Sequence, residues 1–362
     1  MTTEDVTPAR PVLAVERLST MVDTPAGSWP ILGGVDLTVG PREIVGLVGE
    51  SGSGKSMLGR SILRLPGAMA RISGGRIVFD GADLTAMEPD AVRAVRGAGI
   101  ALMPQNYTSA LNPVLTIGKQ LAMVLKAHGR PHRDARTIGI GLLGDLGVPH
   151  PEQMIDAYPG QFSGGMLQRA VMAITLSCEP KLLIADEPTT ALDATMRDRV
   201  LSLLERLRDE RGMSVLIITH DLSTLAGFAD RIYIMYAGRA VEHGATGQLF
   251  GNPAHPYSRA LLASIPRIHA NGGHELPSIP GLPPEFATLG GGCHFAPRCL
   301  HAAPLCHERY PDHFPVPGEA GAPAGLEPEV EHWAACWMTG GQVPELGVPA
   351  LAGHADELRG AR

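Results

Sequence analysis

The sequence lacks the features that would mark a membrane-embedded, nucleic-acid-binding or fibrous protein. No apolar run approaches the roughly 18 residues that a membrane-spanning helix needs. The 30 Lys and Arg residues are outnumbered by 37 Asp and Glu residues, so the net charge is −7 and the positive field of a nucleic-acid-binding protein is absent. We find no sustained heptads and no repeat at a solenoid or propeller period. Residues 1–10 are acidic and polar, so we expect no secretory signal and a soluble, cytoplasmic chain.

What is present is the composition of a globular protein with an unusual C-terminal part. The 362 residues are 44% hydrophobic, enough for about two domains or one elaborated α/β unit. Sixteen of the 31 prolines, four of the five cysteines and nine of the 14 histidines lie after residue 251. A proline-rich stretch cannot sustain long helices or central strands. We therefore expect an α/β body over residues 12–251, a loop-rich module over 252–339 and a mobile tail over 340–362.

The body has the pattern of a mostly parallel sheet with crossover helices. Short runs at Ile44–Val48, 182–185 and 215–218 are apolar on both faces, which is typical of buried parallel strands. Helix-length segments such as 197–207 lie between them. Strands that alternate with helices in this way predict an α/β fold.

One part of the body has a different pattern. The stretch from about residue 83 to 170 lacks buried strands, except at Ile100–Met103. It contains helical patterns at Ile117–Ala127 and at 134–146. We predict that this stretch is an inserted, mostly helical subdomain.

A glycine-rich segment follows the first buried strand. The pattern G-x-x-x-x-G-K-[ST] is formed there by Gly49, Glu50, Ser51, Gly52, Ser53, Gly54, Lys55 and Ser56, before a helical run at 57–63. The glycines let successive backbone N–H groups curl around an anion, and the start of the next helix adds partial positive charge. The pattern predicts a nucleotide phosphate site in which Lys55 reaches the β- and γ-phosphates and Ser56 ligates Mg²⁺.

Two carboxylates follow the apolar run at 182–185. This position places Asp186 at the carboxyl edge of the sheet, where such folds bind nucleotides. We expect Asp186 to hold Mg²⁺ through water and Glu187 to polarise the attacking water. Paired acids are more often a solvated strand end, but a preceding phosphate loop favours the catalytic interpretation. Together the two motifs indicate an ATPase or a GTPase.

Four further segments narrow the class. In chain order they contain Gln105, the run Phe162, Ser163, Gly164, Gly165 and Met166, then Asp193, and finally His220. Singly they are weak signals, because a lone histidine at a strand end is more often structural and a Ser-Gly-Gly triplet is often a turn. Their order after Lys55 and around the two acids resembles the ATP-binding subunit of an ABC transporter. The resemblance identifies residues 12–251 as the nucleotide-binding domain.

The resemblance implies that two such subunits enclose two ATP molecules between them. The phosphate loop of one subunit then faces the signature segment of the other, here Ser163, Gly164, Gly165 and Met166. Ser163 would cap a helix whose two glycines let backbone N–H groups approach the γ-phosphate of the partner's ATP.

The resemblance also implies roles for the single residues. Gln105 would sense Mg²⁺ and the attacking water and link ATP to the membrane subunits. His220 would contact the γ-phosphate and orient Glu187 and the water. Asp193 would organise the seam of the dimer.

The chain departs from the usual family pattern at two places. The signature is usually Leu-Ser-Gly-Gly-Gln, whereas Phe162 and Met166 stand here; this form resembles the peptide-importer branch, so we do not infer an inactive subunit. Adenine usually stacks on an aromatic residue before the phosphate loop, but Met21 and Val22 lie near that position. Trp29 is the nearest candidate for stacking, and a packing or interface role is equally open.

The C-terminal module resembles the extension of dipeptide and oligopeptide importers. The segments that carry this resemblance are Asn-Pro-Ala-His-Pro-Tyr at 252–257, Ser-Ile-Pro at 264–266 and Ile-Pro-Gly-Leu-Pro-Pro at 279–284. A cysteine quartet with the spacing C-x5-C-x6-C-x29-C follows: Cys293, Cys299, Cys306 and Cys336.

The chemistry of this quartet leaves three states open. Disulfides are disfavoured in the cytoplasm, and the close C-x2-4-C pairs of most zinc sites are absent. Four thiolates suit a [4Fe–4S] cluster, which some members of the resembled branch carry, although the ferredoxin spacing is missing. We favour the iron–sulfur cluster over a zinc site and over unligated cysteines. In a zinc site, His294 or His332 could replace one of the cysteine ligands.

The sequence thus predicts the ATP-hydrolysing motor subunit of a bacterial ABC importer, most consistent with dipeptides or oligopeptides. The resemblance implies ATP and Mg²⁺ as ligands, and as partners a second identical or homologous ATP-binding subunit, two membrane permeases and an extracytoplasmic solute-binding protein. Its place would be the cytoplasmic face of the plasma membrane. Nickel, opines or sugars remain open as solutes.

Two other classes fit less well. A soluble ABC protein of DNA repair or translation usually carries a long coiled coil or two nucleotide domains, whereas this chain has one phosphate loop. An iron–sulfur redox protein with a regulatory nucleotide site would not need Glu187 and His220.

Overall fold

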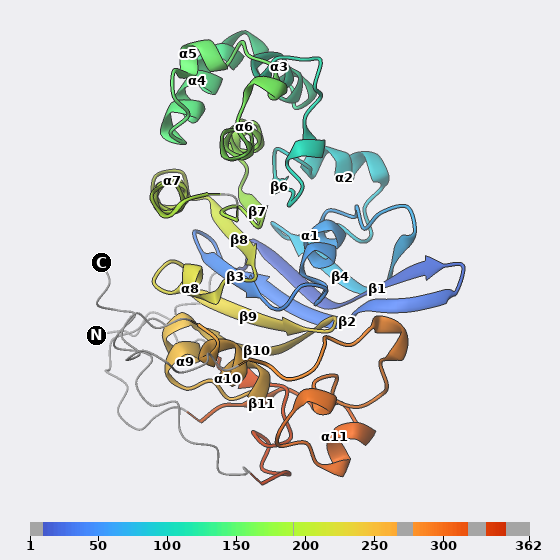
Figure 1. The fold of residues 1–362 in the computed structure, drawn as a ribbon. Helices are drawn as coiled ribbons and strands as arrows, with labels where there is room; N and C mark the ends of the chain where they lie inside the picture. Colours follow the sequence, from blue (N-terminus) through green and yellow to red (C-terminus); the bar gives the residue numbers. More distant parts are fainter. Residues whose placement is uncertain (1–9, 191, 266–277, 318–330, 345–362) are drawn as a thin grey trace, which may run out of the picture.

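Two β-sheets organise the protein. The computed structural model describes residues 10–190, 192–265, 278–317 and 331–344, and these form an eight-stranded sheet and a four-stranded sheet with helices around them (Figure 1).

The centre of the larger sheet is parallel. Strand β3 (Ile44–Val48) pairs with β8 (Ser214–Thr219) on one side and β9 (Arg231–Tyr236) on the other. Strand β7 (Leu182–Asp186) lies between β8 and β6 (Ile100–Met103). All four runs that the sequence marked as buried strands are therefore strands of one parallel core, as predicted.

The other edge of this sheet is antiparallel. Strand β10 (Arg239–Ala245) pairs with β9, and the short strands β12 (Trp333–Ala334) and β11 (Phe314–Pro315) follow it outward. The full order is β11-β12-β10-β9-β3-β8-β7-β6. Part of the C-terminal segment thus extends the sheet of the α/β body.

The core strands are apolar on both faces because the sheet is covered on both sides. Ile44 and Val48 belong to one hydrophobic cluster, together with residues of α6 (Gly164–Leu176) and α7 (Ala194–Arg211). Val45 and Leu47 belong to a second cluster, together with α1 (Lys55–Ile62) and the smaller sheet. Successive side chains of a strand point to opposite faces, so a strand between two covers has no polar side.

The smaller sheet is a feature that the sequence pattern did not predict. It is antiparallel, in the order β2-β1-β4-β5, and comprises β1 (Leu13–Thr24), β2 (Gly27–Val39), β4 (Ala70–Phe79) and β5 (Ala82–Asp83). The pairing of β1 with both neighbours shifts register near Leu18 and Ser19, and Arg17 has a φ of 47°. These bulges break the alternation of apolar and polar residues that would reveal half-exposed strands.

The helical insertion is confirmed. It contains α2 (Pro89–Val95), α3 (Ile117–Ala127), α4 (Ala135–Asp145), α5 (Pro151–Met154) and the start of α6. Helices α3, α4 and α5 gather at one end of the molecule, away from β9 and β10, and α6 lies between them and β7 (Figure 1). The N-terminus of α6 is therefore carried by the insertion.

The rest of the C-terminal segment has short elements. After α8 (Leu222–Leu225) come α9 (Thr246–Gly251), α10 (Pro256–Ala263) and α11 (Pro304–Glu308). Residues 340–344 of the expected tail follow Trp337 in a hydrogen-bonded turn, and residues 345–362 lie outside the described residues. The predicted boundary near Gly251 and the mobile tail stay predictions.

Candidate functional site

The phosphate loop joins β3 to α1 at the carboxyl edge of the parallel strands. Its backbone requires glycine at several positions: Gly52 and Gly54 have φ angles of +80° and +98°. A Cβ on Gly49 would lie 2.1 Å from the carbonyl oxygen of Met235, on the neighbouring strand β9. The loop therefore runs closely over the sheet in a shape that larger residues would disturb.

Lys55 lies inside this loop. Its Nζ donates to the carbonyl oxygens of Gly49, at 2.7 Å, and Glu50, at 2.9 Å, and to Ser53 Oγ at 3.2 Å. Burial lowers the pKa of the Lys55 ammonium, an effect that the carboxylates of Glu187, Asp186 and Glu50 oppose. A cation held among loop carbonyls is where incoming phosphate oxygens would find it.

Asp186 ends β7 beside the loop. Its side chain is buried, and its Oδ1 has no hydrogen-bond partner among the described residues, while the nearby Ser56 hydroxyl acts to lower the pKa of its carboxyl. Burial raises the pKa of Asp186 above its ordinary value. A buried, unsatisfied carboxylate oxygen next to a hydroxyl is a costly arrangement without a cation. Both oxygen donors suit Mg²⁺, so Ser56 and Asp186 fit the ion that the sequence assigned to them.

Glu187 is held from both sides. Its Oε1 accepts the backbone N–H of His220 at 3.1 Å and lies 2.7 Å from His220 Nδ1, while its Oε2 accepts the Thr190 hydroxyl at 2.6 Å. The Glu187 side chain is 9% exposed and the imidazole 56% exposed. The structure thus brings together Glu187 and His220, which directly follow two neighbouring strands, β7 and β8.

The backbone of Glu187 is also fixed. Its φ is 55°, in the left-handed region that non-glycine residues rarely occupy. Its carbonyl oxygen accepts Gln168 Nε2 at 3.2 Å, from the helix that carries the signature segment. Such strain next to fixed polar contacts is typical of functional residues.

Gln105 lies at the same edge of the sheet. It follows β6, in which Met103 pairs with Ala185 of β7, so Gln105 comes one strand away from Asp186. Its side chain is exposed. A position at this edge is consistent with the predicted contact to Mg²⁺ and water.

Two other predicted site residues cap helices. Ser163 Oγ accepts the N–H of Met166 at 3.4 Å and caps α6, as predicted, and both Ser163 and Gly164 are exposed. Asp193 is likewise exposed and caps α7 by accepting the N–H of Met196 at 3.0 Å. Exposed helix starts are available to a second subunit, but their predicted roles toward a partner stay predictions.

Trp29 lies on β2, opposite Val22 of β1, and is half-buried. Two residues later, the carbonyl oxygen of Ile31 approaches Gly54 of the phosphate loop. Stacking of Trp29 on adenine stays a prediction.

Known proteins match the chain along most of its length. The model of the ABC transporter family matches residues 32–190, and the model of the oligopeptide/dipeptide transporter C-terminal region matches residues 241–306. A protein of Brucella abortus (strain 2308) named as a peptide import ATP-binding protein is 43% identical over 317 residues, covering 83% of this chain and 93% of that protein. The chain belongs to the ABC transporter family. It is an ATPase of that family.

Other relatives and solved structures agree. A Brucella suis biovar 1 (strain 1330) protein, also named for peptide import and ATP binding, is 44% identical over 302 residues, with 83% of this chain and 91% of that protein covered. A dimeric bacterial ABC transporter cassette has a TM-score of 0.58 at 25% identity, covering 65% of this chain and 98% of that chain. A cassette bound to ADP and Pi has a TM-score of 0.59 at 24% identity, over 65% of this chain and 98% of that chain, and shows the shared fold.

In the described part of this ABC ATPase, no helix is both long and apolar enough to cross a lipid bilayer.

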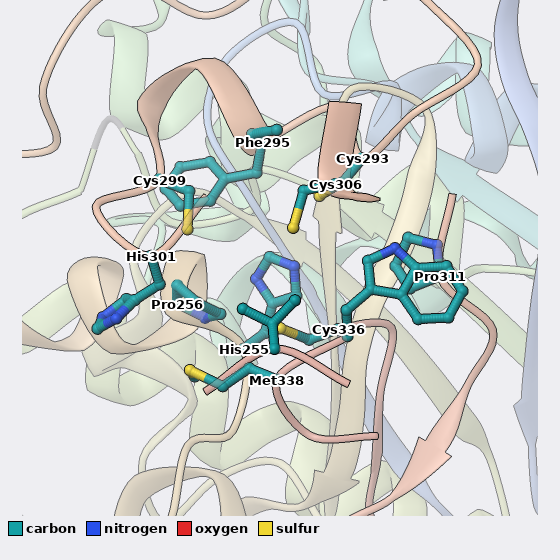
Figure 2. A pocket seen from close by; sticks show the side chains of 13 residues that line it. His255, Pro256, Cys293, Phe295, Cys299, His301, Cys306, Pro311, Cys336 and Met338 are labelled. Carbon is teal, nitrogen blue, oxygen red and sulfur yellow. The ribbon is translucent and has the colours of Figure 1, made fainter. Parts of the chain in front are cut away.

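The cysteine quartet of the ABC ATPase lies around one cavity. Cys293, Cys299, Cys306 and Cys336 line a space of about 20 Å³, little more than one water molecule needs, and their sulfur atoms gather around it (Figure 2). Burial, together with the nearby thiols, raises the pKa of the Cys293 thiol to about 12 and that of Cys299 to about 11. The segment from Cys293 to Cys306 and the more distant Cys336 thus bring four thiols to one cavity.

This cavity does not have the geometry of a formed metal centre. Among the described residues, no group of three or more His, Cys, Asp or Glu side chains is arranged to hold a metal ion. The donor chemistry nevertheless suits a thiophilic metal, because four thiols become four ligands once they lose their protons. Of the histidines considered as substitute ligands, His294 contacts the Ala237 carbonyl at 2.9 Å and His332 contacts Glu242 at 2.9 Å.

Two residues that no sequence motif of the ABC ATPase predicted, Arg298 and Tyr257, contact the phosphate loop from the C-terminal module. Arg298 forms an ion pair with Glu50, with 2.6 Å between Nη1 and Oε2. The hydroxyl of Tyr257 accepts the N–H of Glu50 at 2.8 Å. Arg298 directly precedes Cys299 in the sequence, but nothing in the motif indicates a partner 248 positions away.

Proposed function

We propose that this ATPase is the motor subunit of an importer for dipeptides or oligopeptides. The match of residues 241–306 to the oligopeptide/dipeptide transporter C-terminal region, and the peptide-import names of the Brucella relatives, support this solute class. The observation that carries the catalytic part is the Glu187 carboxylate, held by His220 and Thr190 beside the phosphate loop.

The residues of the chain divide the work of hydrolysis. Glu187 Oε1 accepts a proton from, or orients, the attacking water, and His220 keeps that carboxylate in place and reaches toward the γ-phosphate. Lys55 leaves its loop carbonyls to pair with phosphate oxygens. Ser56 and Asp186 would hold Mg²⁺, with Gln105 at the same edge of the sheet, and the ion would supply positive charge to neutralise the phosphates.

A second subunit completes the proposed site. The exposed N-terminus of α6, with Ser163, Gly164, Gly165 and Met166, would donate backbone N–H groups to the γ-phosphate of ATP bound by the partner. Asp193 would lie at the same seam. Two membrane permeases and an extracytoplasmic solute-binding protein complete the importer, and the ATPase works at the cytoplasmic face of the plasma membrane.

The catalytic assignment is tested with Glu187→Gln. Loss of the carboxylate is expected to lower ATP turnover by about 10²- to 10⁴-fold, the usual contribution of a general base, while ATP binding persists. Glu210→Gln, an exposed carboxylate of α7, is the matched control and should turn over like the parent chain. Parent-like turnover of the Glu187 variant would remove this residue from the mechanism.

The solute class is tested by uptake of labelled dipeptides and oligopeptides into vesicles that hold the complete transporter with its binding protein. We expect uptake that requires ATP and is lost with Glu187→Gln. ATP-dependent uptake of nickel or a sugar without peptide uptake would overturn the peptide assignment and leave the ATPase assignment intact.

We further propose that the cysteine quartet holds a [4Fe–4S] cluster. The four thiols around one cavity, and the suitability of thiolates for iron–sulfur clusters, support this ligand set. The cluster would brace the module, because ATP hydrolysis transfers no electron.

This proposal is tested on anaerobically purified protein. A broad absorption band near about 400 nm with about four irons per chain, lost when all four cysteines become serine, is expected. About one zinc per chain without colour, or no bound metal, would overturn the iron–sulfur assignment.

A further inference from the structure

One side chain of the C-terminal module, that of Arg298, binds the phosphate loop through Glu50. Its side chain is 5% exposed. Nη1 donates to Glu50 Oε2 at 2.6 Å and to the Tyr236 hydroxyl at 3.2 Å, and Nη2 donates to Glu50 Oε1 at 3.0 Å and to the Ile279 carbonyl at 3.5 Å. Nε donates to the Pro280 carbonyl at 2.7 Å. All five N–H groups of a guanidinium have acceptors here, so the fork has one orientation.

Glu50 is held a second time, by its backbone. Its N–H donates to the Tyr257 hydroxyl at 2.8 Å, and Tyr257 is fully buried in α10. The carbonyl oxygens of Gly49 and Glu50 are two of the three acceptors that hold Lys55. A shift of Glu50 would therefore move the part of the loop that positions the phosphate-binding lysine.

The same contacts reach the cysteine cavity. Arg298 closes a short helical turn whose first residue, Ala296, accepts the N–H of Cys299 at 3.2 Å. Phe295 lines the cavity and packs on the rings of Tyr236 and Tyr257, at centroid distances of 5.2 Å and 5.4 Å. Close-packed aromatic rings transmit displacements rather than absorb them. The four thiols and the phosphate loop are thus connected through a few buried side chains.

The charges of Glu50 and Arg298 indicate how their ion pair would affect ATP binding. Glu50 places a carboxylate on a loop that must accept a polyphosphate. Repulsion between this carboxylate and the negatively charged phosphates would oppose ATP binding. Arg298 neutralises that carboxylate with a bidentate pair and fixes the loop at the same time. A loop that occupies its binding conformation only part of the time binds ATP more weakly, in proportion to that fraction. A loop held in that conformation by the Arg298–Glu50 pair avoids this loss of affinity.

We propose that Arg298 is a positioning residue that acts on ATP through Glu50, and that it makes ATP affinity sensitive to the state of the cysteine quartet. This coupling goes beyond the proposed peptide import, and it does not require that the quartet hold iron rather than zinc.

The first test measures the dissociation constant of a fluorescent ATP analogue and the steady-state KM and kcat of the full chain. Arg298→Met should raise the dissociation constant and KM about tenfold, because we expect the loop to occupy its binding-competent conformation only about one tenth of the time. The value of kcat should change less than about twofold. Arg309→Met is the control, since Arg309 lies in the same module over the Trp337 ring, with its guanidinium 5.0 Å from the centroid. An unchanged constant in the Arg298 variant, or an equal loss in the control, overturns the proposal.

A double-mutant cycle with Glu50→Gln tests whether Arg298 acts through Glu50, and Arg298→Gln replaces Arg298→Met in both backgrounds if the methionine variant folds poorly. Glu50→Gln removes only the negative charge, so Arg298→Met should cost much less affinity in that background than in the parent chain. Costs that add would show that the two residues act independently and would overturn the positioning role.

A second cycle tests the connection to the thiols. Changing all four cysteines to serine, or Cys299 alone if the quadruple variant is unstable, should alter the dissociation constant in the parent chain by about threefold or more. The same change should have no effect when Arg298 is already methionine. If the cysteine change leaves the dissociation constant of the parent chain unaltered, or alters it equally in both backgrounds, the proposed coupling is wrong. The proposals on ATP hydrolysis and peptide uptake are tested separately and would not be affected.

Discussion

Glu242 is the group whose removal should most weaken the attachment of the C-terminal segment. It lies on β10 with no exposed surface, and its Oε1 accepts the N–H of Ala254 at 2.7 Å and lies 2.9 Å from His332 Nε2. Its Oε2 accepts the N–H of His255 at 2.8 Å. One carboxylate therefore holds the start of α10 and the residue before β12.

The cost of Glu242→Ala follows from these contacts. Three buried donors lose their acceptor at about 1 kcal/mol or more each, which agrees with the about 3–5 kcal/mol that breaking a buried charged pair costs. Glu242→Gln keeps one oxygen acceptor, so it should cost about 1–2 kcal/mol. Alanine should thus destabilise the protein clearly more than glutamine does.

Urea unfolding followed by tryptophan fluorescence measures this difference, because Trp333 and Trp337 report on the C-terminal segment. Glu308→Gln, an exposed carboxylate of α11, is the control and should change the free energy of unfolding by less than about 0.5 kcal/mol. A loss below about 1 kcal/mol for Glu242→Ala would refute the reasoning that this carboxylate anchors the segment.

Two further predictions concern the loop and the pH dependence. Gly49→Ala should abolish ATP binding, measured by titration, because its Cβ would lie 2.1 Å from the Met235 carbonyl oxygen; Gly141→Ala, on an exposed face of α4 with no atom within 4 Å, should instead stabilise the chain by about 0.5–1 kcal/mol. Burial, helped by Arg231, lowers the pKa of His243 to about 3, so the unfolded chain binds the extra proton first and the free energy of unfolding should fall as pH drops from about 6.5 to 3. His243→Phe should lessen this fall in acid-unfolding measurements, and an identical pH profile in the variant would contradict it.

Local sequence patterns were enough to predict much of the candidate nucleotide site. The glycines of the loop, the apolar strands and the capping Ser163 are dictated by backbone conformation and by burial over a few residues, so their sequence reveals them. The helical insertion was predicted for the same reason, with α3 at the expected bounds. In contrast, the smaller antiparallel sheet escaped notice because bulges interrupt its alternation, and its pairing depends on strands distant in the sequence.

By itself the sequence determined which residues form the motifs that predict phosphate and Mg²⁺ binding, because each of these chemistries needs a particular residue type in a short, ordered motif. Only the tertiary structure decided which of those groups meet. It placed His220 against Glu187, left an oxygen of Asp186 without a hydrogen-bond partner in the described part of the chain, and joined Arg298 to Glu50 across 248 positions. Contacts between distant segments depend on how whole layers pack, and no local pattern encodes that packing.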